Sequence, residues 1–275
     1  MGEQTHVAIY VGPRGSGRAP AIDAAFAGAC PHALLLTPTQ QYARTRAADL
    51  VRAGHVPGLL GRPVESLTVF AQRLVEAELG PAQRIDDWER TLLLRRCLHD
   101  WADGNPDARY AAAARRHGVA EHVARFITQL KQAAIEPEAF GQKLRANRDA
   151  APADAMVEAV YADYQQRLRD IDQYDVPGLF WRAYDIAVAR RPRVLLDVAH
   201  VLLDGFDDFT PSELRLIVAL AAYTRIGIGL NLDPSPDRQD LFYVPNQTLD
   251  TIATEMAGQG RTVAEVRTYA PPPPE

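Results

Sequence analysis

The chain has 275 residues, of which 47% are hydrophobic and 24% are charged, and its formal net charge is -5 at pH 7. This is the composition of a globular protein with material for one large or two small packed domains. The negative charge excludes a protein that coats nucleic acid by bulk electrostatics, so any DNA contact must be local. Cys30 and Cys97 stand alone without CxxC or Cys/His spacing, which argues against a metal site or a disulfide framework.

Strand and helix patterns alternate along the first third of the chain. Buried strands are predicted over residues 6–12, 33–39 and 65–70 (HVAIYVG, ALLLTPT, ESLTVF), and helices over 19–29, over 40–53 and directly after residue 70. Strands separated by helices favour right-handed βαβ units in a parallel sheet.

Helical patterns alone fill residues 86–191. Three apolar stripes at helical spacing predict a packed core, although their aromatic members leave a base-stacking platform as the alternative. The stripes are Trp88, Leu92, Leu94, Leu98 and Trp101, then Val119, Val123, Phe126, Ile127 and Leu130, and then Val157, Val160, Tyr161, Tyr164, Leu168 and Ile171.

Strand patterns return over residues 193–206 and 224–234, and a last strand is predicted over 262–269 after a helix at 249–257. Between the first two strands, Thr210, Pro211 and Glu213 form the signature of a capped helix start. We therefore predict an α/β domain over residues 1–85 and 192–270, interrupted by an all-helical subdomain over 86–191. The final PPPPE, residues 271–275, reads as a linker to a further part of a longer protein.

The N-terminus has no basic segment followed by an apolar one, and no apolar stretch approaches the length of a membrane span. We expect a soluble cytoplasmic protein without membrane contacts.

The segment YVGPRGSGRA, residues 10–19, nearly matches the phosphate-binding template G-x-x-x-x-G-K-[ST]. Gly12, Gly15 and Gly17, with Arg14 and Ser16 between them, retain the cradle whose backbone N–H groups would surround a phosphate. Arg18 replaces the lysine, and Ala19 replaces the hydroxyl residue that ligates magnesium. The alternative is a glycine-rich turn of the kind that any doubly wound sheet uses.

A second strand should carry a carboxylate for the metal and, in hydrolases, a glutamate beside it. Asp204 follows an apolar run, but Gly205 stands where the glutamate is expected. On the bland interpretation, Asp204 and Gly205 simply begin a turn. Both departures predict little or no ATP hydrolysis, and they leave ATP with magnesium as a weak ligand at most.

Six segments in this order resemble the N-terminal region of the AddB/RexB family, the helicase-like nuclease subunits of bacterial double-strand-break-processing complexes, which are related to the UvrD/Rep helicases. They are YVGPRGSGRA, LLLTPTQQYA, VESLTVFAQRLVEAELG, FITQLKQAAIEPEAF, LLDGFDDFTPSELRLIVAL and GIGLNLDP, together spanning residues 7–234. The resemblance implies a RecA-like domain with a phosphate-binding loop and a helical insertion. It also implies two partners, single-stranded or end DNA and a UvrD-like, AddA-like motor subunit.

In that family the strand after the loop leads into a segment facing single-stranded DNA. The resemblance therefore makes Thr37, Thr39, Gln40, Tyr42 and Arg44 candidate DNA contacts, through hydrogen bonding, stacking and phosphate neutralisation. Thr68 is added because VESLTVFAQRL resembles a helicase segment that usually contains a threonine at this place. A surface helix with solvated arginines is the alternative.

The leading hypothesis is an inactivated helicase-like domain that binds DNA and supports the complex, without catalysis by this chain alone. A functional nucleotide-binding half-site and a pure docking module for a motor subunit are the alternatives. The chain is too short for a second RecA-like domain or for a C-terminal nuclease domain.

Overall fold

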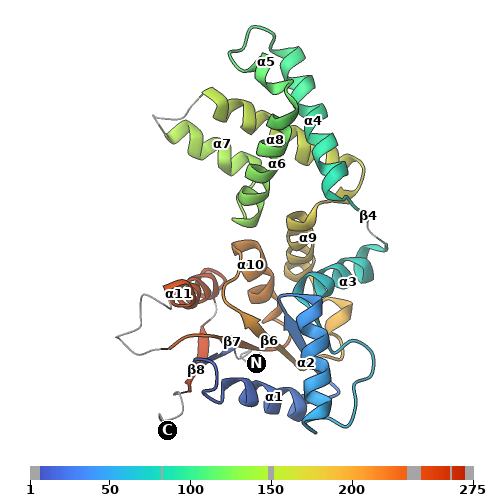
Figure 1. Ribbon diagram of the computed structural model, residues 1–275, viewed down its shortest axis with the longest axis vertical. Coiled ribbons are helices and arrows are strands. Elements are labelled where there is room, and N and C mark those ends of the chain that lie inside the picture. The colour runs from blue at the N-terminus through green and yellow to red at the C-terminus, as the bar shows by residue number, and fades with distance from the viewer. Residues whose placement is uncertain (1–6, 82, 148–151, 234–242, 261, 270–275) are drawn as a thin grey trace. The chain divides into compact units, whose positions relative to one another are not determined.

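The computed structural model describes residues 7–81, 83–147, 152–233, 243–260 and 262–269. The chain divides into two compact units, Met1–Gly80 with Arg182–Glu275, and Pro81–Trp181. The first unit is built on a sheet and the second on helices (Figure 1). The predicted linker, residues 271–275, lies outside the described residues.

Six parallel strands form the sheet of the first unit, in the order β3-β2-β6-β7-β1-β8. They are β1 (Val7–Val11), β2 (Ala33–Thr37), β3 (Val64–Ser66), β6 (His200–Phe206), β7 (Arg225–Leu230) and β8 (Val263–Thr268). The central strands are buried almost throughout, which explains why they read as continuous apolar runs. The predicted α/β class with a parallel sheet is confirmed.

The helices of this unit begin at side-chain caps. Thr39, Ser66 and Thr210 each accept a hydrogen bond from a backbone N–H three residues later, and the predicted capping box of Thr210 and Glu213 is confirmed. The helices are α1 (Arg18–Ala29), α2 (Gln40–Arg52), α3 (Leu67–Leu79), α10 (Pro211–Leu220), α11 (Tyr243–Gly258) and the 3₁₀ helix η1 (Arg193–Leu195). Ile22 and Phe26 of α1 pack with strand residues in the apolar core of the unit.

The second unit has its own apolar core, which buries Leu94, Leu98, Ile127, Val160 and Tyr161. Its elements are α4 (Asp87–Gly104), α5 (Ala111–Ala114), α6 (His117–Gln132), α7 (Pro137–Ala146), α8 (Pro152–Asp170) and the parallel pair β4 (Gln83–Arg84) and β5 (Gln173–Tyr174). Helix α9 (Val176–Ala189) crosses the boundary between the two units.

Two predicted strands are shorter in the structure. The strand predicted over 193–206 occupies only 200–206, because the amide of Arg193 donates to Glu78 Oε1 at 2.6 Å and η1 forms in place of a ladder. The strand predicted over 65–70 ends at Ser66, whose hydroxyl caps α3 by accepting from the amide of Val69. Thr68 consequently lies in the first turn of a helix.

Four residues of the predicted apolar stripes are not buried. Trp88, Leu92, Phe126 and Ile171 are exposed, so their assignment to the core was wrong. Among the helices in the described ranges, none combines the length and apolar character needed to cross a bilayer.

Candidate functional site

The candidate site residues gather at one edge of the sheet. The glycine loop follows β1, Thr37 ends β2, Thr68 follows β3, and Asp204 lies near the end of β6 (Figure 1). Because all these strands are parallel, their carboxyl ends meet at this edge. The parallel topology therefore brings the predicted loop and the predicted carboxylate together.

The loop has the backbone of a tight strand-to-helix turn. Gly15 and Gly17 adopt positive φ angles of 81° and 90°, which glycine tolerates best. Gly12 has a different reason to be glycine, because a Cβ there would lie 2.9 Å from Tyr269 Cβ. Tyr269 donates its amide to Val11 O at 2.7 Å and stacks on Tyr10. The glycine pattern thus serves packing against Tyr269 as well as the turn.

Arg18, at the lysine position, is buried with incomplete pairing. Its side chain is 8% exposed, and its Nε and Nη1 atoms have no hydrogen-bond partner. Burial lowers the pKa of Arg18, while the charge of nearby Asp204 opposes that shift. Arg14 and Ser16 lie in the same loop, Arg14 exposed and Ser16 with a buried, unpartnered Oγ. The loop therefore presents donor groups without acceptors.

Asp204 is already neutralised by an arginine. Arg46 of α2 places Nε 3.2 Å from Asp204 Oδ2, and its Nη2 donates to Asp23 Oδ1 of α1. Burial acts to lower the pKa of Arg46, but the hydrogen bond and the two carboxylates outweigh it and raise the pKa. Arg46 therefore remains charged between two buried carboxylates.

The residues present do not fit a magnesium ion. Ala19 has no ligand oxygen, and Asp204 already faces the guanidinium of Arg46. Within the described ranges, no group of three or more His, Cys, Asp or Glu side chains is arranged to hold a metal.

The position for a catalytic glutamate is sterically closed. Gly205 has φ +87°, and a Cβ there would lie 2.4 Å from Cε1 of Tyr42. A glutamate at this place would collide with the Tyr42 ring and strain the backbone. The glycine noted in the sequence is therefore required by packing.

Three of the six candidate DNA contacts have structural roles. Thr37 is buried, and its hydroxyl donates to the carbonyls of Thr39 and Glu65. Thr39 caps α2, and Gln40 accepts the amide of Ser66 through Oε1. These contacts account for the three residue types without any ligand.

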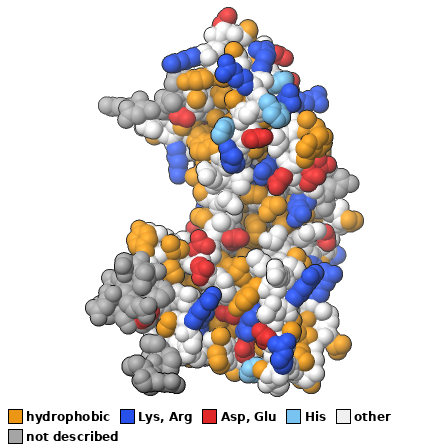
Figure 2. Space-filling model, viewed as in Figure 1, with side chains coloured by type: hydrophobic (Ala, Val, Ile, Leu, Met, Phe, Trp, Pro, Cys, Tyr) orange, Lys and Arg blue, Asp and Glu red, His pale blue; other side chains and the backbone are white. Residues whose placement is uncertain are grey.

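Tyr42, Arg44 and Thr68 are accessible at the same edge. The ring of Tyr42 is 36% exposed, while burial of its hydroxyl side raises its pKa, together with the charge of Asp204. Arg44 is exposed on α2, and Thr68 is half-buried at the start of α3. Figure 2 shows basic and acidic side chains interspersed on the visible face, without a surface of one sign.

Sequence analysis missed Arg46, Asp23 and Tyr269. Asp23 offered a signal, because a single carboxylate within the small and apolar residues of α1 calls for a buried partner. Arg46 had no such signal, since it is one of several arginines in α2 and only the fold turns it inward.

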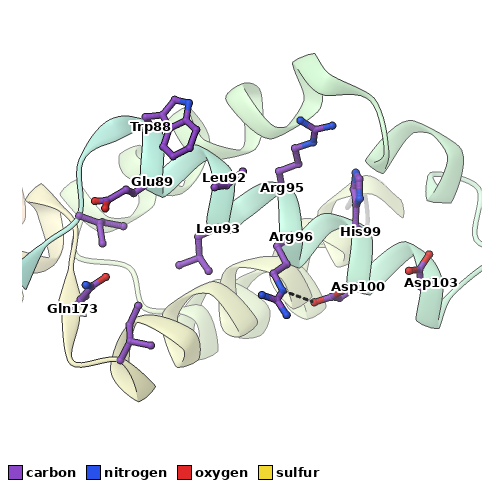
Figure 3. Close-up of a pocket in the computed structure, with 12 residues that line it drawn as sticks. Trp88, Glu89, Leu92, Leu93, Arg95, Arg96, His99, Asp100, Asp103 and Gln173 are labelled. Carbon is purple, nitrogen blue, oxygen red and sulfur yellow. Dashed lines mark ion pairs between the residues drawn. The ribbon is translucent and has the colours of Figure 1, made fainter.

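The helical unit contains a separate surface groove along α4 (Figure 3), lined partly by Trp88, Leu92 and Ile171. These three side chains are 71%, 50% and 54% exposed. The acidic residues at its rim are engaged: Asp100 pairs with Arg167 at 2.7 Å, and Asp103 pairs with Arg115. An apolar floor with a polar rim is typical of a protein-docking surface.

Comparison with known proteins identifies one family. The family described as "ADDB, N-terminal" matches residues 22–273, a range that begins after the glycine loop. The chain is 28% identical over 233 residues to the B-type ATP-dependent helicase/deoxyribonuclease subunit of Desulforudis audaxviator, covering 81% of this chain and 19% of that protein. The proteins of the same name from Bacillus cereus strain B4264 and from Bacillus anthracis are 27% and 28% identical over 234 residues, with 80% of this chain and 20% of each protein covered. The chain thus spans about a fifth of the length of these relatives.

Proposed function

Because the chain belongs to the AddB N-terminal family, we propose that it is the helicase-like region of a cytoplasmic subunit that processes DNA double-strand breaks. In this proposal the region binds DNA and supports the complex, and it does not hydrolyse ATP. Its sheet unit is a RecA-like domain over residues 1–85 and 192–270, and residues 86–191 are the inserted helical subdomain. The parallel sheet and the separate compact helical unit support this architecture.

The ion pair between Arg46 and Asp204 carries the proposal of an inactive site. A phosphoryl-transfer site needs a carboxylate that is free to hold the metal and its water, and this carboxylate is neutralised from within the protein. Ala19 removes the other metal ligand, and the packing of Gly205 against Tyr42 excludes a water-orienting glutamate. Three independent features therefore remove the three parts of the reaction.

Calorimetric titration of the purified chain with Mg-ATP and with a non-hydrolysable analogue tests this proposal, together with a phosphate-release assay. We expect no turnover, and any binding should be the same in magnesium and in EDTA. Magnesium-dependent turnover that Asp204→Ala abolishes would refute the inactive site.

A nucleotide-binding half-site is the second candidate, and Arg18 favours it. A buried guanidinium with two unpartnered nitrogens is a donor group that an oxyanion would satisfy. The same titration separates the candidates, because only the half-site predicts heat on adding ATP that Arg18→Gln removes.

For DNA, the proposal assigns the accessible residues Tyr42, Arg44 and Thr68 to contact with a single strand. Stacking on Tyr42 and charge neutralisation by Arg44 are the contacts that bind single strands without reading sequence. Fluorescence anisotropy with an oligothymidylate should give an affinity that falls as salt rises. Arg44→Gln should weaken binding, whereas Arg52→Gln on the same helix, which removes an arginine paired with Asp49, should not.

The AddA-like motor subunit is the proposed protein partner, and the α4 groove is the surface that favours docking. Co-purification of the two full-length subunits, with and without Trp88→Ala and Leu92→Ala together, tests this assignment. Undiminished association would move the docking surface elsewhere.

A further inference from the structure

A second hollow lies on the sheet unit, away from the glycine loop. It has a volume of about 470 Å³ and is lined by residues of β1, β6, β7 and β8. The strand register explains how they meet: His200 pairs with Arg225, and Tyr10 pairs with Arg267. Paired residues of neighbouring strands point to the same face of a sheet, so four strands deliver these side chains to one place.

Gly227 keeps this hollow open. A Cβ at Gly227 would lie 2.5 Å from Leu202 Cδ2, 3.2 Å from Tyr10 Cε2 and 3.4 Å from His200 Nε2. Any larger residue at the centre of β7 would occupy the space between Tyr10 and His200. The hollow is therefore a consequence of the sequence RIGIGL, which alternates small and large residues between the two faces.

The polar groups around the hollow are predominantly cationic. Arg225 is exposed, and its guanidinium has no partner among the residues that the structure describes. Arg267 pairs with Glu265 at 2.8 Å and lies over the ring of Tyr10. Burial lowers the pKa of His200, and the charges of Arg225 and Arg267 lower it further. One carboxylate thus faces two guanidinium groups and an imidazole.

We propose that this hollow binds a phosphate monoester, with the phosphate held by Arg225 and Arg267 and with His200 as a third donor. A single arginine satisfies a carboxylate in bidentate fashion, whereas several converging donors suit the three free oxygens of a phosphate monoester. The volume exceeds what a bare phosphate fills and leaves room for the group that it esterifies. The inference does not depend on the function proposed above, because none of these residues belongs to the glycine loop or to the α2 surface.

Calorimetry on the full chain with deoxyadenosine monophosphate is the first test, and Arg225→Gln is the first variant. Loss of a charge-assisted hydrogen bond should weaken binding at least about tenfold. Arg62→Gln, which removes an exposed arginine elsewhere on the same unit, is the matched control and should leave the affinity unchanged. Because Arg225 is exposed, a thermal melt of the variant should match that of the wild type. The absence of binding at millimolar nucleotide, or equal binding by Arg225→Gln and Arg267→Gln, would overturn the proposal.

Two arms distinguish the source of the phosphate. A free nucleotide and the terminal phosphate of a DNA strand present the same group, so an oligonucleotide with a 5′-phosphate is compared with its 5′-hydroxyl form. Tighter binding of the phosphorylated strand that Arg225→Gln removes identifies a strand end. Equal binding of both strands, with nucleotide binding retained, identifies a free ester.

The pH dependence gives a readout that a merely structural role would not move. Sulfate serves as the probe, because it keeps its charge near neutral pH. His200 faces Arg225, Arg267, Glu265 and Tyr10, and an anion placed among them favours its protonated form. Sulfate binding should therefore strengthen as the pH falls from 8 toward 6 and should take up a proton. His200→Gln should bind sulfate with an affinity that no longer changes over this range. The same slope in His200→Gln would contradict the role of the imidazole.

Discussion

Arg46 Nε lies 3.2 Å from Asp204 Oδ2, and the same guanidinium donates to Asp23. The arginine comes from α2 and the two carboxylates from β6 and α1, so one side chain joins three elements around the sheet edge. In an active phosphoryl-transfer site a metal ion supplies positive charge near such a carboxylate. Here the protein supplies that charge itself, and the arrangement becomes part of the fold.

Replacing Arg46 should therefore destabilise the sheet unit. Arg46→Leu leaves Asp23 and Asp204 buried without a counter-charge, and breaking a buried pair in this way costs roughly 3 to 5 kcal/mol. Urea denaturation measures the loss. Arg44→Leu, on the exposed side of the same helix, should change stability by less than about 0.5 kcal/mol. Equal effects of the two substitutions would contradict the ion-pair role.

Restoring the missing loop residues should not restore magnesium binding. In Arg18→Lys with Ala19→Thr the loop regains its lysine and hydroxyl, but Asp204 remains paired with Arg46. We expect calorimetry to show no difference between Mg-ATP and ATP in EDTA for this double variant. Adding Arg46→Gln should introduce a magnesium dependence, provided that the triple variant gives a cooperative melt. Magnesium dependence in the double variant alone would mean that the ion pair opens readily.

A side chain at Gly205 should be costly for two reasons. Gly205→Ala imposes a positive φ on an L-residue and brings a methyl group against Tyr42. We expect a loss of about 2 kcal/mol in the free energy of unfolding. Tyr42→Ala in the same chain should return part of that loss by removing the collision. Gly258→Ala, in a helix and without close neighbours, is the control and should be neutral or stabilising.

The elements were predictable because their signals are local. The buried strands, the capping box at Thr210 and the start of α2 each depend on a few consecutive residues, and each formed where expected. The strand over 65–70 failed because the cap at Ser66 prevailed over the β-propensity of Thr68, Val69 and Phe70.

The chemistry of the site was only half predictable. The motif identified the loop and Asp204, but the group that neutralises Asp204 comes from a distant part of the sequence. Thr37, Thr39 and Gln40 were assigned to DNA, and the structure gives each of them a contact within the protein. Such residues look alike in a sequence whether their polar atoms face a ligand or the backbone.

Helix α4 allows the same substitution to be compared on two faces. Leu98 is fully buried in the core of the helical unit, whereas Leu92 is 50% exposed in the groove. Leu98→Ala should lower stability by about 3 kcal/mol through lost burial and a cavity. Leu92→Ala should cost less than about 1 kcal/mol in the isolated chain. Denaturation of both variants checks this contrast, and comparable losses would mean that the groove is closed in solution.

The core of the helical unit contains a buried ion pair. Lys131 Nζ lies 2.5 Å from Asp175 Oδ1, and both side chains are almost completely buried. Asp175 also accepts hydrogen bonds from the Tyr164 hydroxyl and the Gly178 amide, each at 2.9 Å. Burial acts to raise the pKa of Asp175, but the charge and hydrogen bond of Lys131 outweigh it, so the pKa lies below its ordinary value of 3.8.

This depressed pKa fixes the sign of the pH dependence. The folded state binds the Asp175 proton more weakly than the unfolded state, so its contribution is fully present above the unfolded value of 3.8 and is lost as the pH falls through the folded value. Asp175→Asn should therefore be least stable relative to wild type near neutral pH, by roughly 3 kcal/mol, because Lys131 is left without its partner. The difference should shrink as the pH falls below 3.8. Urea denaturation at neutral and acidic pH measures it, with the exposed Asp170→Asn as the control. A difference that stays constant down to the acid transition would show that Asp175 contributes by shape and hydrogen bonding, which asparagine retains in part, rather than by charge.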